Sequence, residues 1–90
     1  MFVSFTDWEF DGNVDNAVEG IKANWPEIRK YGAVNTRCTV TGEHTLRTMT
    51  LWRSKELLDV NVDPISALAT SASGMAPTSG ITGPLAVELD

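Results

Sequence analysis

The sequence predicts an α+β domain of the ferredoxin-like class, with the element order strand, helix, hairpin, helix, strand. Apolar residues recur at helical spacing over residues 14–28, which is the pattern of an amphipathic helix. Two runs rich in Thr and Val, 33–41 and 45–54, are separated by a short Gly-Glu-His segment and predict a β-hairpin. Asp63-Pro64 has the form of a helix start, with Asp as the cap and Pro at the first helical position. We therefore expect the order βαββαβ, in which both helices lie on one face of a four-stranded antiparallel sheet.

The first strand and the first helix follow one another along the chain. Residues 1–6 are rich in Phe and Val and predict a strand, which a turn cluster at 11–13 ends. Pro26 lies inside the helical pattern, and its missing N–H and its ring predict a kink. Gly32 suits the left-handed conformation that often ends a helix. The apolar stripe of this helix consists of Val14, Val18, Ile21, Trp25 and Ile28.

The remaining elements come from the last third of the chain. Ser54 is a suitable cap for a short helical turn over residues 55–59. The helix that starts at Asp63 is expected to end at Gly74. A stretch rich in Pro, Gly, Ser and Thr, 76–84, predicts a loop, and residues 85–89 predict the last strand. The apolar side of the second helix consists of Ile65, Leu68, Ala69 and Ala72.

Composition limits the class of protein. A chain of 90 residues and 9.8 kDa has the size of one domain, 1–90, and 42% hydrophobic residues are typical of a globular chain. The net charge of −5 disfavours binding to nucleic acid or to an anionic membrane surface. No apolar run approaches the ~20 residues of a membrane span, and residues 1–10 have no basic region of a signal peptide. With Cys38 as the single cysteine, the expected location is the cytoplasm.

The alternation of side chains along each strand divides the predicted sheet into two faces. One set of residues is nearly all apolar, and we expect it to lie beneath the helices. The other set carries two Trp among hydroxyls and charges, and burial against a second copy of the sheet would account for it. A homodimer is therefore expected. The first set consists of Val3, Phe5, Val34, Thr36, Cys38, Val40, Met49, Leu51, Leu85, Val87 and Leu89, and the second of Ser4, Thr6, Trp8, Asn35, Arg37, Thr39, Thr48, Thr50, Trp52, Ala86 and Glu88.

One stretch carries a family resemblance: Leu51-Trp52-Arg53-Ser54-Lys55-Glu56-Leu57-Leu58-Asp59, with Asp63-Pro64 after it. It resembles the dimeric α/β-barrel superfamily, and more narrowly its antibiotic-biosynthesis-monooxygenase type. Those proteins typically end the third strand with an aromatic residue, a Ser and a Glu, and enter a helix through a short segment that ends in Pro. Members often carry a His in that segment, where Asn61 stands in this sequence.

The resemblance implies a dimer of two ferredoxin-like subunits with their sheets face to face, and a pocket between the helices and the sheet of each subunit. Cofactor-free oxygenases of this type can use a Trp and a Tyr six positions apart, which is the spacing of Trp25 and Tyr31. The superfamily also contains isomerases, dehydratases and haem-degrading proteins, so the resemblance implies a fold without selecting one activity.

The predicted pocket between helices and sheet suits a small apolar ligand, of an aromatic or acyl type. Apolar walls with a few polar groups are the usual chemistry of such pockets. No cofactor is expected, because the sequence contains no glycine-rich motif for a dinucleotide or a phosphate. The predicted lining consists of Phe5, Trp25, Tyr31, Met49, Leu51 and Asn61.

Three functions remain open for this pocket. The first is binding of a small molecule without turnover. The second is a cofactor-free monooxygenase or isomerase for phenolic or polyketide-like substrates, in which Tyr31 or Asn61 polarises a carbonyl and Arg53 holds an anionic end. The third is a structural dimer with a filled core and no ligand. A void beneath Trp25 would favour the first two.

The other polar residues predict no further site. His44 is the only His and lies in the hairpin loop, whereas a zinc site generally needs several His or Cys ligands. Cys38 is expected to be a buried, inert thiol. Asp7, Glu9 and Asp11 alternate as in a solvated strand end, and no calcium loop follows them. No metal site is therefore predicted.

Overall fold

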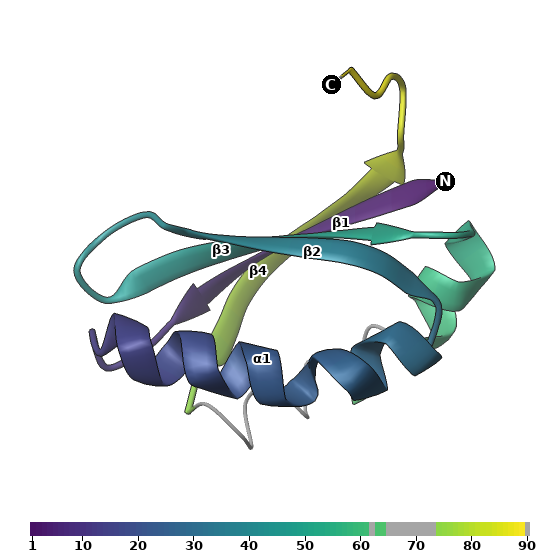
Figure 1. Ribbon diagram of the computed structural model, residues 1–90. Coiled ribbons are helices and arrows are strands. Elements are labelled where there is room, and N and C mark those ends of the chain that lie inside the picture. The colour runs from purple at the N-terminus through teal and green to yellow at the C-terminus, as the bar shows by residue number, and fades with distance from the viewer. Residues whose placement is uncertain (62, 65–73, 90) are drawn as a thin grey trace.

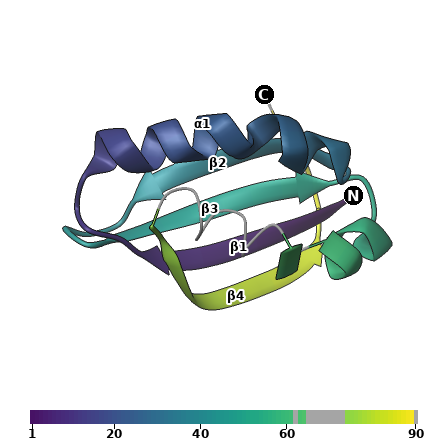
Figure 2. The ribbon, with the colours of Figure 1, turned by 90° about the horizontal axis from the view of Figure 1, so that it is seen from below.

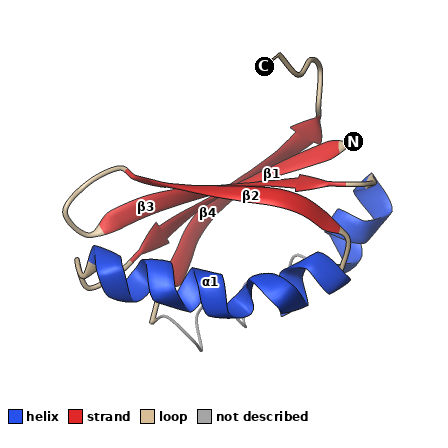
Figure 3. Cartoon of the chain, in the orientation of Figure 1, coloured by secondary structure: helices blue, strands red, loops and turns tan. Residues whose placement is uncertain are grey.

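Four strands form one antiparallel sheet in the order β2-β3-β1-β4, and helix α1 lies against one of its faces (Figures 1 and 3). The computed structural model describes residues 1–61, 63–64 and 74–89. A second helical segment, at 55–61, follows β3. The predicted ferredoxin-like order is confirmed. The elements are β1 (Phe2–Glu9), α1 (Val14–Lys30), β2 (Ala33–Val40), β3 (Thr45–Trp52) and β4 (Ala76–Pro84).

Helix α1 begins and ends where local chemistry dictates. The Asn13 side chain caps it by accepting a hydrogen bond from the backbone N–H of Asn16 at 3.0 Å. The helix continues through Pro26 as one element and ends at Tyr31, the C-cap. Gly32 follows with a φ of +103°, and a Cβ there would lie 2.6 Å from Cδ1 of Leu57. Glycine at this position therefore both turns the chain and lets the second helical segment approach.

The two faces of the sheet are the reverse of the prediction for β1 and β3. Trp8 and Trp52 lie beneath the helices, where each is almost fully buried. The Trp8 cluster contains Phe10, Ala17, Leu46 and Met75, and the Trp52 cluster contains Ile28, Ala33 and Leu58. The apolar residues of the other parity, including Val3, Phe5, Met49 and Leu51, therefore lie on the face without helices.

Hydrogen bonds between neighbouring strands explain this orientation. The indole N–H of Trp8 donates to Oγ1 of Thr48 at 2.9 Å, and that of Trp52 donates to Oγ of Ser4 at 3.0 Å. An indole buried without an acceptor would carry an unsatisfied donor, so these hydroxyls favour the burial of both Trp on this face. Two of the hydroxyls that suggested a semi-polar interface, those of Ser4 and Thr48, are partners of the two Trp in the core.

Strand β2 changes parity at its start. The pairing with β3 shifts between Ala33 and Asn35, so that Ala33 lies opposite Trp52 and Asn35 lies opposite Leu51. This irregularity leaves Val34 exposed and turns Asn35 and Arg37 toward the helix-free face. Arg37 therefore lies on the helix-free face, opposite Met49, and not on the face of the two Trp where the sequence predicted it. Cys38, which was expected to be buried, is exposed.

The last strand is not where the sequence predicted it. β4 is formed by Ala76–Pro84, the predicted loop, and pairs with β1 along its length. An edge strand needs a backbone ladder on one side only, so it tolerates Pro and Gly that would weaken a central strand. Residues 85–89, the predicted strand, have no regular structure. Most of the predicted helix from Asp63 to Gly74 lies outside the described residues, and no helix in the described ranges is long and apolar enough to cross a membrane.

The hydrogen bond from Trp52 to Ser4 gives a first prediction. We expect Ser4→Ala to lower the free energy of unfolding by about 1–3 kcal/mol, because the buried indole N–H loses its acceptor. In a Trp52→Phe background the same change should cost much less, since no donor is left there to satisfy. Urea unfolding followed by circular dichroism measures all four proteins, and an equal cost in both backgrounds would contradict the role of this bond.

Candidate functional site

A small cavity lies between α1 and the sheet. Its volume is about 50 Å³, which is room for one or two water molecules or a substituent of a larger ligand. Three of the residues that line it are threonines on strands, and the other lining residues are mainly apolar. The described lining consists of Trp8, Ile21, Asn24, Ile28, Thr36, Thr48, Thr50 and Met75.

A larger groove adjoins this cavity at the edge of the sheet, where α1 runs along β2 (Figure 2). It measures about 380 Å³ and is open to solvent. Ile21 and Thr36 line both the groove and the cavity, so the two spaces share a wall. The volume of the groove lies within the ~300–1,000 Å³ of small-molecule pockets. The groove is lined by Ile21, Lys22, Trp25, Asn35 and Thr36.

The cavity is lined by neutral hydroxyl groups, and the groove carries one charged side chain. The hydroxyls of Thr36 and Thr50 are 2.9 Å apart, and Thr36 Oγ1 also donates to the backbone oxygen of Met49 at 3.2 Å. None of the described residues that line the cavity has an ionisable side chain. At the groove, Lys22 is exposed and lies 3.8 Å from Glu19. The inner space therefore offers hydrogen bonding without a general base, and the mouth offers a cation.

Of the residues predicted for the pocket, only Trp25 lines the groove. It is half-buried and packs against the cluster around Trp52. Tyr31 is 38% exposed at the end of α1. Arg53 is exposed at the end of β3. Neither Tyr31, Arg53 nor Asn61 is among the described residues that line the cavity or the groove.

The side chain of Asn61 forms hydrogen bonds with the backbone. Its buried side chain donates from Nδ2 to the backbone oxygen of Tyr31 at 3.1 Å and to that of Leu57 at 2.9 Å. The bond to Tyr31 holds the second helical segment against the end of α1, and the bond to Leu57 lies within that segment. Proteins of the type that the sequence resembles often carry a His at this position. Here the position is Asn61, whose side chain joins the second helical segment to the end of α1.

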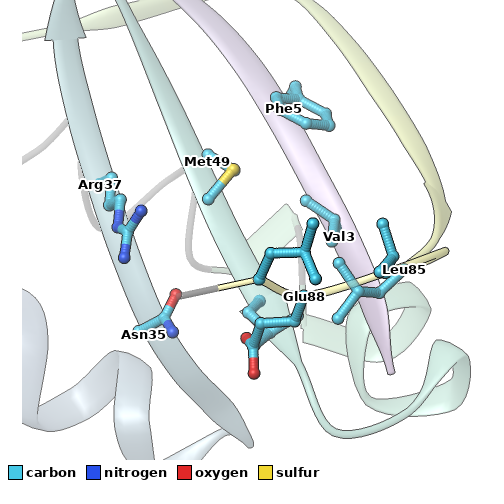
Figure 4. Close-up of a pocket in the computed structure, with 10 residues that line it drawn as sticks. Val3, Phe5, Asn35, Arg37, Met49, Leu85 and Glu88 are labelled. Atoms are coloured by element: carbon cyan, nitrogen blue, oxygen red, sulfur yellow. The ribbon is translucent and has the colours of Figure 1, made fainter.

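The other three predicted residues, Phe5, Met49 and Leu51, lie on the helix-free face of the sheet. They border a second groove of about 290 Å³ between this face and residues 85–89 (Figure 4). The predicted lining is therefore divided between two faces, and its part in ligand binding stays a prediction. The sequence predicted Ile21 on the helix stripe and Thr36 beneath the helices but included neither in the pocket lining, and it placed Thr48 and Thr50 on the other face together with the two Trp. The groove is lined by Val3, Phe5, Asn35, Arg37, Met49, Leu51, Leu85, Val87, Glu88 and Leu89.

An ion pair fastens three strands on the helix-free face. Arg47 on β3 donates from Nε to Oδ1 of Asp7 at 2.8 Å and from its terminal nitrogen to Oδ2 at 3.1 Å, and Ser79 on β4 donates to Oδ2 at 2.8 Å. These hydrogen bonds, that from Arg47 first, lower the pKa of Asp7 to about 2. The guanidinium of Arg47 also lies 6.0 Å from the centre of the Phe5 ring.

Cys38 is not activated as a nucleophile. Desolvation by its neighbours raises the pKa of its thiol above the usual value, which keeps the thiol protonated near neutral pH. Among the described residues, no group of three or more His, Cys, Asp and Glu lies close enough together to hold a metal ion.

Comparison with known proteins places the fold. No model of a known protein family matches the chain, and no curated protein matches its sequence. The structure of SnoaB, a cofactor-independent oxygenase from Streptomyces nogalater, matches with a TM-score of 0.71 at 10% identity, over 98% of this chain and 96% of that one. The fold is ferredoxin-like and is similar to that of solved antibiotic biosynthesis monooxygenases. The resemblance read from the sequence is confirmed at the level of the fold.

Two further structures extend the comparison. A monooxygenase from the gene ActVA-Orf6 of Streptomyces coelicolor, solved in complex with nanaomycin D, has a TM-score of 0.61 and 17% identity over 99% of this chain and 91% of that one. A dimeric ferredoxin-like protein from an uncultured marine organism has a TM-score of 0.62 and 14% identity over 100% of this chain and 99% of that one. At these identities the likeness concerns the fold and leaves the activity open.

The Asp7 ion pair predicts a specific pH dependence. Because the pKa of Asp7 is lowered to about 2 from about 3.9 in an unfolded chain, its contribution to stability is present above about pH 4 and is lost as the pH falls toward 2. We expect Asp7→Asn to lower the free energy of unfolding at neutral pH. The variant should also lose less stability than the wild type as the pH falls from 4 to 2. Urea unfolding across that pH range measures both.

Asp59→Asn is the matched control, because the one ion pair of Asp59 among the described residues is an exposed contact at 4.0 Å with Lys55. If wild type and Asp7→Asn lost stability in parallel on acidification, the ion pair would not contribute to folding.

Proposed function

We propose that the protein is a homodimer that binds a small aromatic or acyl-type molecule between α1 and the sheet of each subunit. The observation that supports this most directly is the open groove beside Trp25, which shares Ile21 and Thr36 with the hydroxyl-lined cavity. A ligand of a few fused rings would lie in the groove and extend one substituent into the cavity.

The lining of the groove defines what such a ligand must offer. The indole of Trp25 is a flat apolar wall against which an aromatic ring can stack. The hydroxyl oxygen of Thr36 could accept a hydrogen bond from a ligand phenol, because its own proton is donated to the backbone oxygen of Met49. Lys22 at the mouth would favour a ligand with an anionic or strongly polar end.

A second candidate function is a cofactor-free monooxygenase for phenolic or polyketide-like substrates. It is favoured by the fold likeness to SnoaB, a cofactor-independent oxygenase, and to the monooxygenase solved with nanaomycin D. In such a reaction an ionised substrate would reduce dioxygen directly. We place this candidate second because Asn61, one of the two expected donors, already gives both amide hydrogens to backbone oxygens. A dimer without a ligand is the third possibility.

The helix-free face supports the dimer. It presents mainly aliphatic side chains and methionine, and Ile81 on β4 is largely exposed there. A contiguous apolar sheet face of this kind is rarely left to solvent, and a small domain gains stability by covering it. A second copy of the same face is the occupant that the fold likeness to a dimeric ferredoxin-like protein favours.

Ligand binding is tested with anthrone and 2-naphthol as probes, by isothermal titration calorimetry. We expect Trp25→Leu to weaken binding by about tenfold or more, because the ring loses its stacking wall, and Thr36→Val to weaken it by a smaller factor. Tyr31→Phe is the matched control and should leave the affinity unchanged. No binding to the wild type, or an equal loss in Tyr31→Phe, would argue against this groove as the site.

The same samples separate binding from turnover. Anthrone recovered unchanged after incubation in air supports a binding protein, whereas its oxidation above the uncatalysed rate supports the second candidate. If neither probe binds nor reacts, the dimer without a ligand is favoured.

The dimer is tested by light scattering at micromolar concentration, where the mass should be about twice the 9.8 kDa of the chain. We expect Arg37→Glu to weaken association by roughly a hundredfold or more, since it places a carboxylate in a face that becomes buried. Arg29→Glu, the same substitution on the helix layer, should have little effect. A wild-type monomer under these conditions would refute the proposed assembly.

A further inference from the structure

The hydroxyls of Thr36 and Thr50 form a short chain of hydrogen bonds in the wall of the inner cavity. The two residues lie directly opposite each other on β2 and β3, and their hydroxyl oxygens are 2.9 Å apart. Oγ1 of Thr36 is also 3.2 Å from the backbone oxygen of Met49. A carbonyl oxygen can only accept a hydrogen bond, so the single proton of the Thr36 hydroxyl is donated to Met49.

The direction of the second hydrogen bond follows from the first. Because Thr36 has no proton left to donate, the bond between the two hydroxyls runs from Thr50 to Thr36. The proton of Thr50 is thereby used inside the wall, while its oxygen keeps both lone pairs and that of Thr36 keeps one. Each of these two hydroxyls can therefore accept a hydrogen bond from a ligand, and neither can donate one.

The other polar residues of the cavity add little donor capacity. Thr48 accepts from the indole of Trp8 at 2.9 Å, and no described residue accepts its own proton, so this hydroxyl can still donate. Asn24 already has an interaction partner. The described wall thus offers accepting oxygens at Thr36 and Thr50, and one hydroxyl proton at Thr48.

We propose that Thr36 fixes the direction of this chain and thereby makes the inner cavity selective for a ligand hydroxyl over a ligand carbonyl. This rests on the ligand site proposed above and names the chemical group that enters its cavity. A hydroxyl donates to an accepting oxygen of the wall, whereas a carbonyl leaves those oxygens without a partner. Thr36 is a positioning residue in this scheme, because it acts on the ligand by holding the proton of Thr50.

The polarity of the wall also bears on the chemistry of the ligand. An oxyanion that develops in a reaction is stabilised by hydrogen-bond donors at about 2.7–3.1 Å. Two of the three threonines of this wall would present lone pairs to it instead. The selectivity therefore suits a ligand whose hydroxyl stays protonated, as it does in binding without turnover.

The compounds 2-tetralol and 2-tetralone test the inference. They share one carbon skeleton with an aromatic ring and differ only in carrying a hydroxyl or a carbonyl at the same position. We expect the wild type to bind the alcohol about tenfold or more tightly than the ketone, because the ketone leaves the accepting oxygens unpaired. Isothermal titration calorimetry at pH 7 measures both affinities.

Two valine substitutions separate the direction of the chain from the mere presence of hydroxyls. Thr36→Val removes the acceptor of the Thr50 proton, so that Thr50 can donate to a ligand. We expect this variant to bind 2-tetralone about threefold to tenfold more tightly than the wild type does, and 2-tetralol a few-fold less tightly. Thr50→Val leaves the Thr36 proton on Met49. It should weaken the binding of 2-tetralol without strengthening that of 2-tetralone.

Thr39→Val is the matched control, because Thr39 is exposed on the same strand and does not line the cavity or the groove. It should leave both affinities unchanged. Thr36→Ser keeps the hydroxyl and should retain the preference of the wild type for the alcohol. Near-UV circular dichroism checks that each variant is folded.

Different results would overturn the inference and the site. Equal affinity of the wild type for the two compounds would show that the wall does not select a hydroxyl. If Thr36→Val lost affinity for both compounds by the same factor, Thr36 would only support the structure, and the ligand site would stand without this selectivity. If neither compound bound to the wild type, the proposed site would fail and the selectivity with it.

Discussion

Two indole-to-hydroxyl hydrogen bonds between β1 and β3 determine how the whole sheet is used. Trp8 on β1 donates to Thr48 on β3, and Trp52 on β3 donates back to Ser4 on β1. Each acceptor is the diagonal neighbour of its donor, because Trp8 lies directly opposite Leu46 and Trp52 lies opposite Phe2. A slip of one residue in this pairing would break both bonds and place the two indoles on opposite faces of the sheet. The register of the two central strands and the composition of the core are therefore fixed by the same contacts.

This arrangement gives each face of the sheet a different chemistry. On the helix side, the residues that satisfy the indoles belong to a row of hydroxyls, and the row continues to Thr36 and Thr50 at the cavity. A hydrogen-bonding wall is thereby present in an otherwise apolar layer. On the helix-free side, the apolar side chains need no hydrogen-bond partners and can be covered by an equally apolar surface. The polar cluster around Asp7 on this side is satisfied by hydrogen bonds within the chain.

The sequence was sufficient for the order of elements and insufficient for the direction of their side chains. The stripe of α1 and the hairpin signal depend on local periodicity, which reports local structure well. The two faces of the sheet were assigned wrongly because both contain apolar residues. A rule that buries the more apolar set takes no account of a hydroxyl on the next strand that accepts a hydrogen bond from an indole. β4 was missed because pairing with β1 is made by the backbone, which composition does not report. The hydrogen bond from Asn61 to Tyr31 depends on a carbonyl 30 residues away, which only the folded chain brings near.

The irregular pairing at the start of β2 connects the two sides of the molecule. Without it, Asn35 would share a face with Trp52; with it, Asn35 lies opposite Leu51 and borders both the groove beside α1 and the groove on the helix-free face. β2 is an edge strand, so one of its residues can border spaces on both sides of the sheet. The proposed ligand site and the proposed dimer contact thus share a wall at this edge. A ligand that displaces Asn35 would have to move the backbone that also carries Arg37, and for that reason both proposals depend on the same short stretch of β2.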